Sequence, residues 1–152
     1  MKKILIPTDF SENAGDALSY ALDFIANQKA TIHIVNIINP NFLPVEAPEM
    51  SVNLLGQVID DAKERMKALE AFSVKRFGND EKAQIKVTTD VITGTVAQSI
   101  KNEAIEKSVD LIIMGTKGKN HNLPNKIFGT VSTSTITDAP CPIILIPQGY
   151  KF

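Results

Sequence analysis

Residues 111–132 read LIIMGTKGKNHNLPNKIFGTVS. The four apolar residues at the start are stopped by Gly115, a pattern that favours a short strand buried on both faces of a parallel sheet. A polar, lysine-containing loop follows and closes on Gly129 and Thr130, ahead of a predicted helix. The N–H groups and partial positive charge at a helix start favour phosphate. The segment therefore predicts either a place to hold a phosphorylated ligand or an ordinary solvated loop, and by itself it does not separate them.

The composition is ordinary for a globular protein, with 43% hydrophobic and 22% charged residues. We expect residues 1–152 to form a single domain. The net charge of -1 gives no global field that would recruit nucleic acid or an acidic membrane. The first apolar run ends at Pro7, too short for a signal peptide or membrane span. We expect a cytoplasmic protein without nucleic-acid or membrane partners.

Neither a disulfide nor a Cys/His metal site is expected. The chain has one cysteine, Cys141, which cannot form an internal disulfide. Its two histidines are far apart in sequence, and His33 in mid-strand reads as a packed, hydrogen-bonded side chain.

Apolar runs and helical spacing alternate along the chain. The spacing predicts helices at 12–27, 51–77, 95–107 and 130–138, and strands at 3–7, 31–36, 84–92, 111–114 and 143–146. The long second helix is expected to bury Leu55, Val58, Ile59, Ala62, Met66, Leu69 and Phe72. This alternation predicts an α/β fold with parallel strands and right-handed crossovers.

The strand order follows from which strands read as buried. The strand at 84–92 has one half-polar face, and the strand at 143–146 is bracketed by prolines, so both are expected at edges. The strands at 3–7 and 111–114 read as central. The prediction is a doubly wound, five-stranded sheet of order 3-2-1-4-5 with helices on both faces.

That order places a topological switch point between the first and fourth strands. Ligands of such sheets bind at the carboxyl ends of the strands beside this point. The loops that meet there would be Pro7-Thr8-Asp9 and residues 115–129, which favours a ligand site over an ordinary loop. Walker A, GxGxxG and Gly-x-Ser-x-Gly motifs are absent from the sequence.

The pattern that is present is Gly115-x-x-Gly118, ten residues, then Gly129-Thr130. Together with Pro7-Thr8-Asp9, the string DLIIMG at 110–115 and APCP at 139–142, it resembles the universal stress protein family over nearly the whole chain. The nucleotide-binding branch of that family has nine residues where this chain has ten, 119–128. A bulge would absorb the extra residue, or the residue would shift Gly129.

The resemblance implies an adenine-nucleotide site at this switch point. Asp9 would accept hydrogen bonds from ribose hydroxyls or adenine, beside Pro7 and Thr8, and Val35 would offer backbone groups to the adenine edge. The ribose and α-phosphate would be lined by Met114 and Gly115. Asp9 could instead cap the first helix.

The phosphates would be cradled by N–H and hydroxyl groups of Gly118, Gly129, Thr130, Val131 and Ser132. From the residues alone, we add the loop lysines as candidate counter-charges. These are Lys117, Lys119 and Lys126.

The leading hypothesis is an ATP-binding regulatory protein of the stress-response type, with Mg²⁺ as a candidate companion of the triphosphate. ATP would order the loop 117–128 and so present that surface to a partner protein. A homodimer is expected through antiparallel pairing of the apolar edge strand 143–146. The alternatives are a nucleotide-free dimeric scaffold and a slow ATPase. No general base can be assigned near the γ-phosphate, so we predict no catalytic residue.

Overall fold

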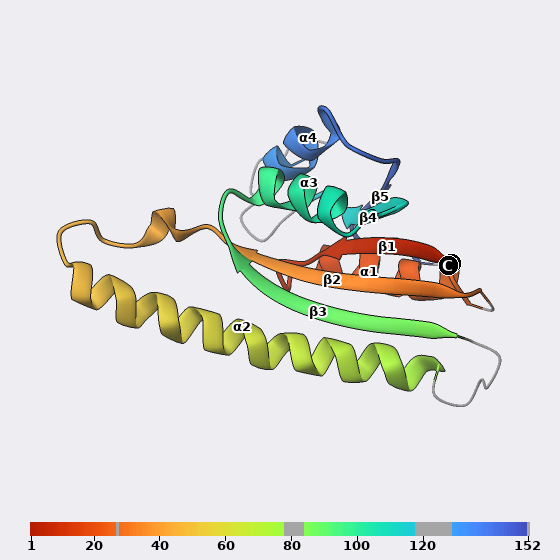
Figure 1. Ribbon diagram of the computed structural model, residues 1–152, viewed down its shortest axis with the longest axis horizontal. Helices are drawn as coiled ribbons and strands as arrows, with labels where there is room; N and C mark the ends of the chain where they lie inside the picture. Colours follow the sequence, from red (N-terminus) through yellow and green to blue (C-terminus); the bar gives the residue numbers. More distant parts are fainter. Residues whose placement is uncertain (27, 78–83, 118–128, 152) are drawn as a thin grey trace.

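The computed structural model describes residues 1–26, 28–77, 84–117 and 129–151 (Figure 1). In chain order its elements are β1 (Lys2–Pro7), α1 (Glu12–Phe24), β2 (Ala30–Ile38), a 3-10 turn η1 (Pro40–Phe42), α2 (Pro48–Phe77), β3 (Ile85–Thr93), α3 (Val96–Glu106), β4 (Leu111–Gly115), α4 (Thr130–Ile136) and β5 (Ile143–Ile146). The strands form one parallel sheet of order β3-β2-β1-β4-β5, which confirms the predicted class and order.

The sheet is covered by helices on both faces. Successive side chains of a strand point to opposite faces. In β1, Ile4 and Ile6 pack in one apolar cluster with α1 and with Met66 of α2, whereas Leu5 packs in a second cluster with Ile100 of α3. The predicted layers are therefore confirmed, and α4 packs beside α3.

The two edge strands are less buried than the centre. Ile4, Leu5 and Ile6 of β1 are fully buried, whereas no residue of β3 is. In β5, Ile146 is buried and the three residues before it are only half-buried. The expectation that β3 and β5 form the edges is confirmed.

Helix boundaries differ from those predicted. The first helix ends at Phe24 rather than at 27, a position outside the described residues. Helix α2 begins at Pro48, three positions before the predicted start, because the fixed φ of proline suits a first helical turn. Helix α4 ends at Ile136, because Thr137 is extended with a ψ of 122°, and Asp138 follows with a left-handed φ of 56°.

Of the apolar stripe predicted for α2, only Ala62 and Met66 are buried; Leu55, Val58, Ile59 and Leu69 are half-buried, and Phe72 is exposed. Phe72 is 51% exposed, and its neighbour Ser73 is buried instead. The Ser73 hydroxyl donates to the carbonyl oxygen of Leu69 over 2.7 Å, so its polar atom is satisfied without water. The prediction of Phe72 as a buried residue was wrong because it considered only apolar residues and did not allow for a serine on the buried face.

Candidate functional site

A cavity of about 310 Å³ opens at the carboxyl ends of β1 and β4, at the topological switch point. The structure brings ten of the predicted site residues together around it: Pro7, Thr8, Asp9, Val35, Met114, Gly115, Gly129, Thr130, Val131 and Ser132. The other predicted residue, Gly118, lies outside the described residues, as do Lys119 and Lys126. Lys117, named as a candidate counter-charge, also lines the cavity.

The sequence reasoning missed four apolar residues of the cavity wall. Ala14 comes from α1, Ile37 from β2, and Val96 and Ile100 from α3. Val96 and Ile100 belong to the helix that follows β3. The strand order could have found them, because the helix after β3 returns across the sheet beside the switch point.

The loop after β1 is held by hydrogen bonds to β2. The amide of Thr8 donates to the carbonyl oxygen of Val35 over 2.8 Å, and the Asn36 side chain donates to the carbonyl oxygen of Thr8 over 2.9 Å. Phe10 has a left-handed φ of 62°, and its amide donates to the Thr8 hydroxyl oxygen over 3.1 Å. These contacts fix the position of the Asp9 backbone at the rim of the cavity.

Helix α1 is capped by Ser11. The Ser11 hydroxyl accepts from the amide of Ala14 over 3.2 Å, and Oδ1 of Asp9 accepts from the amide of Ser11 over 3.0 Å. The alternative duty considered for Asp9, capping the helix, therefore belongs to Ser11. Asp9 supports that cap from the preceding turn while lining the cavity.

The exit from β4 is organised by Asn13, a residue of α1 that is 2% exposed. Its Oδ1 accepts from the amide of Lys117 over 2.8 Å. A Cβ atom at Gly115 would lie 2.7 Å from the same Oδ1, too close for any other residue without movement. Gly115 is thus required here by the close approach of α1 to the end of β4.

Two of the predicted phosphate-binding groups already have protein partners. The Ser132 hydroxyl donates to the carbonyl oxygens of Gly115 and Thr116, both at 3.1 Å. The amide of Gly129 donates to the carbonyl oxygen of Thr116 over 2.7 Å. The remaining candidate donors are the first-turn amides of Thr130, Val131 and Ser132, which have no intrahelical acceptor.

The sequence of residues 1–147 matches the universal stress protein family. The chain belongs to that family. It is 29% identical over 150 residues to universal stress protein MJ0531 of Methanocaldococcus jannaschii, an alignment that covers 99% of this chain and 84% of the relative.

Solved structures of family members share the fold. The structure of MJ0577, a universal stress protein of the same organism, has a TM-score of 0.83 and 27% identity, covering 99% of this chain and 98% of the other. The universal stress protein UspA from Lactobacillus plantarum has a TM-score of 0.81 and 22% identity, covering 95% and 97%.

In this member of the universal stress protein family, the charged residues of the described cavity wall are Asp9 and Lys117. Within residues 1–26, 28–77, 84–117 and 129–151, no group of three or more His, Cys, Asp or Glu side chains is placed to hold a metal ion. In the same ranges, no helix has both the length and the apolarity needed to cross a membrane.

A second polar cluster, none of whose residues lines the cavity, lies between β2, β3 and α3. Nε2 of the buried His33 lies 3.2 Å from Oε2 of Glu103, and Nδ1 lies 2.9 Å from the Thr88 hydroxyl. Burial lowers the pKa of His33, Lys107 lowers it further, and Glu103 opposes both. A neutral His33 satisfies all of these contacts by donating to Glu103 and accepting from Thr88. The expectation of a packed, hydrogen-bonded histidine is confirmed.

Proposed function

We propose that this universal stress protein binds an adenine nucleotide, ATP, in the cavity at the ends of β1 and β4, and regulates a partner in a stress response through its occupancy. The observation that carries the proposal is the convergence around one cavity of ten residues chosen from sequence alone. An apolar pocket with a few polar groups is typical of small-molecule sites. Val35, Ile37, Val96 and Ile100 give this cavity apolar walls, and Asp9 and Lys117 give it opposite charges.

Each part of the nucleotide has a proposed contact. The base would lie against the apolar walls from β2 and α3, and Asp9 would accept from the ribose hydroxyls. The amides at the start of α4 would donate to phosphate oxygens, together with Lys117. Asp9 is the only carboxylate among the described lining residues, so Mg²⁺ would be held chiefly by the phosphates.

Two solved family members indicate which nucleotides belong in the test. One universal stress protein is described in complex with cAMP, and one from Arabidopsis thaliana with AMP bound. They are 15% and 17% identical to this chain, and at this identity the likeness shows only that the fold is shared. The argument for binding here therefore rests on the cavity.

The test is calorimetric titration with ATP, ADP, AMP, cAMP and GTP, each with and without Mg²⁺. We expect saturable binding of ATP, and we expect Val96→Phe to abolish it because the larger side chain fills the cavity. Val74→Phe makes the same change at a half-exposed position of α2 outside the cavity lining, and should bind normally. An absence of heat with every nucleotide would favour the dimeric scaffold instead.

The slow ATPase remains a separate outcome of the same experiment. Release of ADP, followed by chromatography over hours, would reveal turnover. If release occurs and is lost in Asp9→Ala while ATP still binds, the chain is an enzyme as well as a binding protein. Without such release, binding alone stands.

We also propose that residues 1–152 act as one domain and form a homodimer through β5. Pro142 and Ile146 direct their carbonyl oxygens to amides of the β4 segment, which sets the alternation of β5. Ile143 and Leu145 accordingly direct their amides to the open edge. Leu145→Pro should therefore halve the molar mass in light scattering, whereas Leu145→Ala, which also removes the side chain, should remain dimeric. Equal masses for both variants would contradict this dimer.

A further inference from the structure

The first half of α2 is only weakly packed: before Ala62, its side chains are at most half-buried. The helix has 30 residues, yet its buried side chains are Ala62, the last residue of the first half, and Met66 and Ser73 in the second half. None of the side chains at 48–61, all of which the structure describes, is buried. Figure 1 shows this half extending beyond the carboxyl ends of β2 and β3. Helices in proteins owe most of their stability to tertiary packing. We therefore expect another surface to pack against this half of α2.

Large apolar side chains are exposed along α2. Met50 and Val52 are 63% and 71% exposed in the first half, and Phe72 is 51% exposed in the second. Leu54, 37% exposed, is about five turns from Phe72, so the two side chains emerge on the same side of the helix.

The residues between Leu54 and Phe72 follow a heptad spacing. Steps of four and three alternate through Leu54, Val58, Asp61, Arg65, Ala68 and Phe72, which we call the α2 seam. This spacing is typical of a helix that pairs with another helix. The seam is apolar at both ends, and at its centre Asp61 and Arg65 form an exposed ion pair at 3.1 Å.

Charge is divided between the halves of α2. Residues 48–62 carry three carboxylates and no lysine or arginine, whereas residues 63–77 carry five such cations and two carboxylates. The helix dipole favours this order only in the first and last turns, so it does not account for Asp60, Asp61, Lys63 and Lys67 near the middle. An antiparallel copy of the same helix would present the opposite charge to each half.

We propose that α2 pairs in antiparallel fashion with α2 of a second copy of this chain. About a two-fold axis at position 63, Leu54 faces Phe72, Val58 faces Ala68, and Asp61 faces Arg65, each pair occurring twice, as an isologous interface requires. The weakly packed first half of each helix then lies on the sheet-backed second half of the other. Helix α2 contacts β3 and β2, at the edge of the sheet opposite β5, and no residue of the α2 seam lines the described cavity or belongs to β5.

Complementary charge reversals test the pairing by sedimentation velocity. Asp61→Arg leaves two arginines on each seam and Arg65→Asp leaves two aspartates, so each variant alone should lose the association. An equimolar mixture restores both cross-pairs, and its weight-average mass should rise clearly above that of either variant alone, toward twofold when pairing is complete. Any pairing through β5 contributes equally to all samples. Recovery in the mixture is decisive, because Arg65→Asp also removes the guanidinium contact with the Phe10 ring at 5.4 Å.

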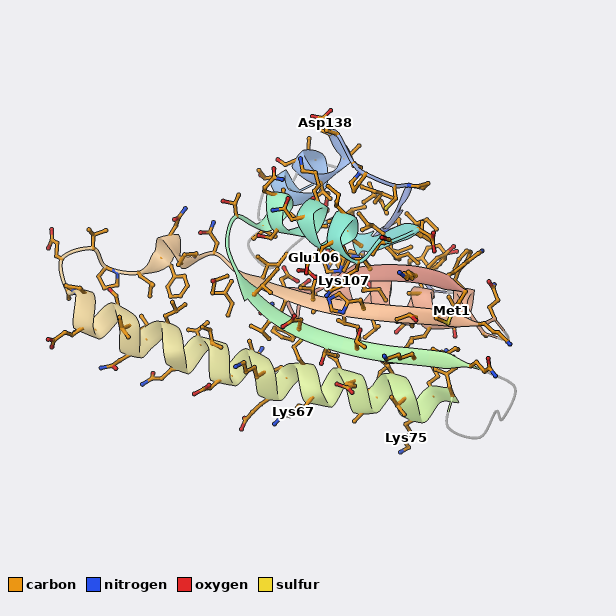
Figure 2. The ribbon with its side chains drawn as sticks, viewed as in Figure 1. Met1, Lys67, Lys75, Glu106, Lys107 and Asp138 are labelled. Carbon is orange, nitrogen blue, oxygen red and sulfur yellow. The ribbon has the colours of Figure 1, made fainter. Side chains whose placement is uncertain are left out.

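The matched control reverses charges off the seam. Asp60→Arg and Lys67→Asp make the same charge changes on exposed positions, and Figure 2 shows Lys67 directed away from the sheet. Alone or mixed, these variants should match the unaltered chain in mass. The proposal is overturned if the unaltered chain has the same mass as Asp61→Arg at every concentration, which would leave the surface to a different partner. It is equally overturned if the mixture fails to regain mass.

Discussion

The side-chain amide of Asn13 donates to the carbonyl oxygen of Ile146 over 2.9 Å. Through its Oδ1 the same side chain also accepts from the amide of Lys117 over 2.8 Å. One buried residue of α1 therefore joins the end of β5 to the exit of β4, where the cavity begins. This geometry ties the stability of the fold to the shape of the proposed site.

Replacing Asn13 with alanine should lower the free energy of unfolding by about 1–3 kcal/mol, because it removes a buried side chain's hydrogen bonds and leaves the half-buried amide of Lys117 without this acceptor. Urea denaturation measures the change. Asn102→Ala is the matched control, since the exposed Asn102 bonds only to the neighbouring Gln98 among the contacts found for its side chain in the described residues. Equal stability of the two variants would show that the Asn13 contacts contribute little.

Gly115→Ala should destabilise the fold by about 1–3 kcal/mol, the usual cost of forcing extra atoms into a packed site. The new Cβ would lie 2.7 Å from Oδ1 and 3.0 Å from the backbone oxygen of Asn13. Gly56→Ala, where a Cβ meets nothing within 4 Å, should instead stabilise α2 by up to about 1 kcal/mol. Thermal unfolding of the two variants should therefore shift in opposite directions.

Ser132→Ala should reduce stability by about 1–2 kcal/mol, since it removes the hydroxyl that bonds the Gly115 and Thr116 carbonyl oxygens. Nucleotide affinity should fall with it, because α4 is then less firmly held against the end of β4. Ser134→Ala alters an exposed serine of the same helix and should change neither quantity. Calorimetry and urea denaturation of this pair separate a specific contact from a general effect on the helix.

Asp9→Asn should weaken ATP binding about tenfold, or ~1.4 kcal/mol, through loss of a charged acceptor for the ribose hydroxyls. The amide retains an oxygen to accept from Ser11, so the α1 cap should survive. Glu12→Gln, which neutralises an exposed carboxylate nearby in sequence, is the control and should bind normally. Tighter binding by Asp9→Asn would mean that Asp9 lies near the phosphates, contrary to the proposed orientation.

The buried His33 should make stability fall in mild acid. Its pKa in the fold is lowered from an ordinary value of 6.5 by burial and by Lys107. At a pH between the lowered pKa of the folded state and 6.5, His33 binds a proton in the unfolded chain but not in the folded chain. The free energy of unfolding therefore decreases as the pH falls below 6.5. Above that value the full stability is present.

His33→Gln should flatten this slope in urea titrations between about pH 5 and 8, whatever it does to stability at neutral pH. Replacing the chain's other histidine, His121, in the same way should leave the slope unchanged. An identical slope in both variants would assign the acid sensitivity to other groups.

The strand order of the sheet could be predicted because local patterns of apolar and polar residues indicate it. The continuous apolar runs at β1 and β4 and the half-polar β3 each indicate a depth in the sheet, and the strand order brings the two cavity loops together. The ends of helices were predicted less well, since the start at Pro48 and the exit at Thr137 depend on single backbone angles.

The residues that escaped prediction act through contacts distant in sequence. Asn13 is polar and buried, and its partners Lys117 and Ile146 are visible only once the fold is formed. Ser132 was expected to face the ligand, yet its hydroxyl is used to fasten α4 to the end of β4. No pattern of polarity along the chain distinguishes a hydroxyl that binds a ligand from one that binds a carbonyl.

The bond from the amide of Gly129 to the carbonyl oxygen of Thr116, 2.7 Å long, fastens the two ends of the intervening segment to each other. The entropy of closing a segment rises only slowly with its length, so one added residue alters that term by a small fraction of a kcal/mol. An insertion between the two anchors should therefore cost little stability while the walls from β1, β2 and α3 keep their positions.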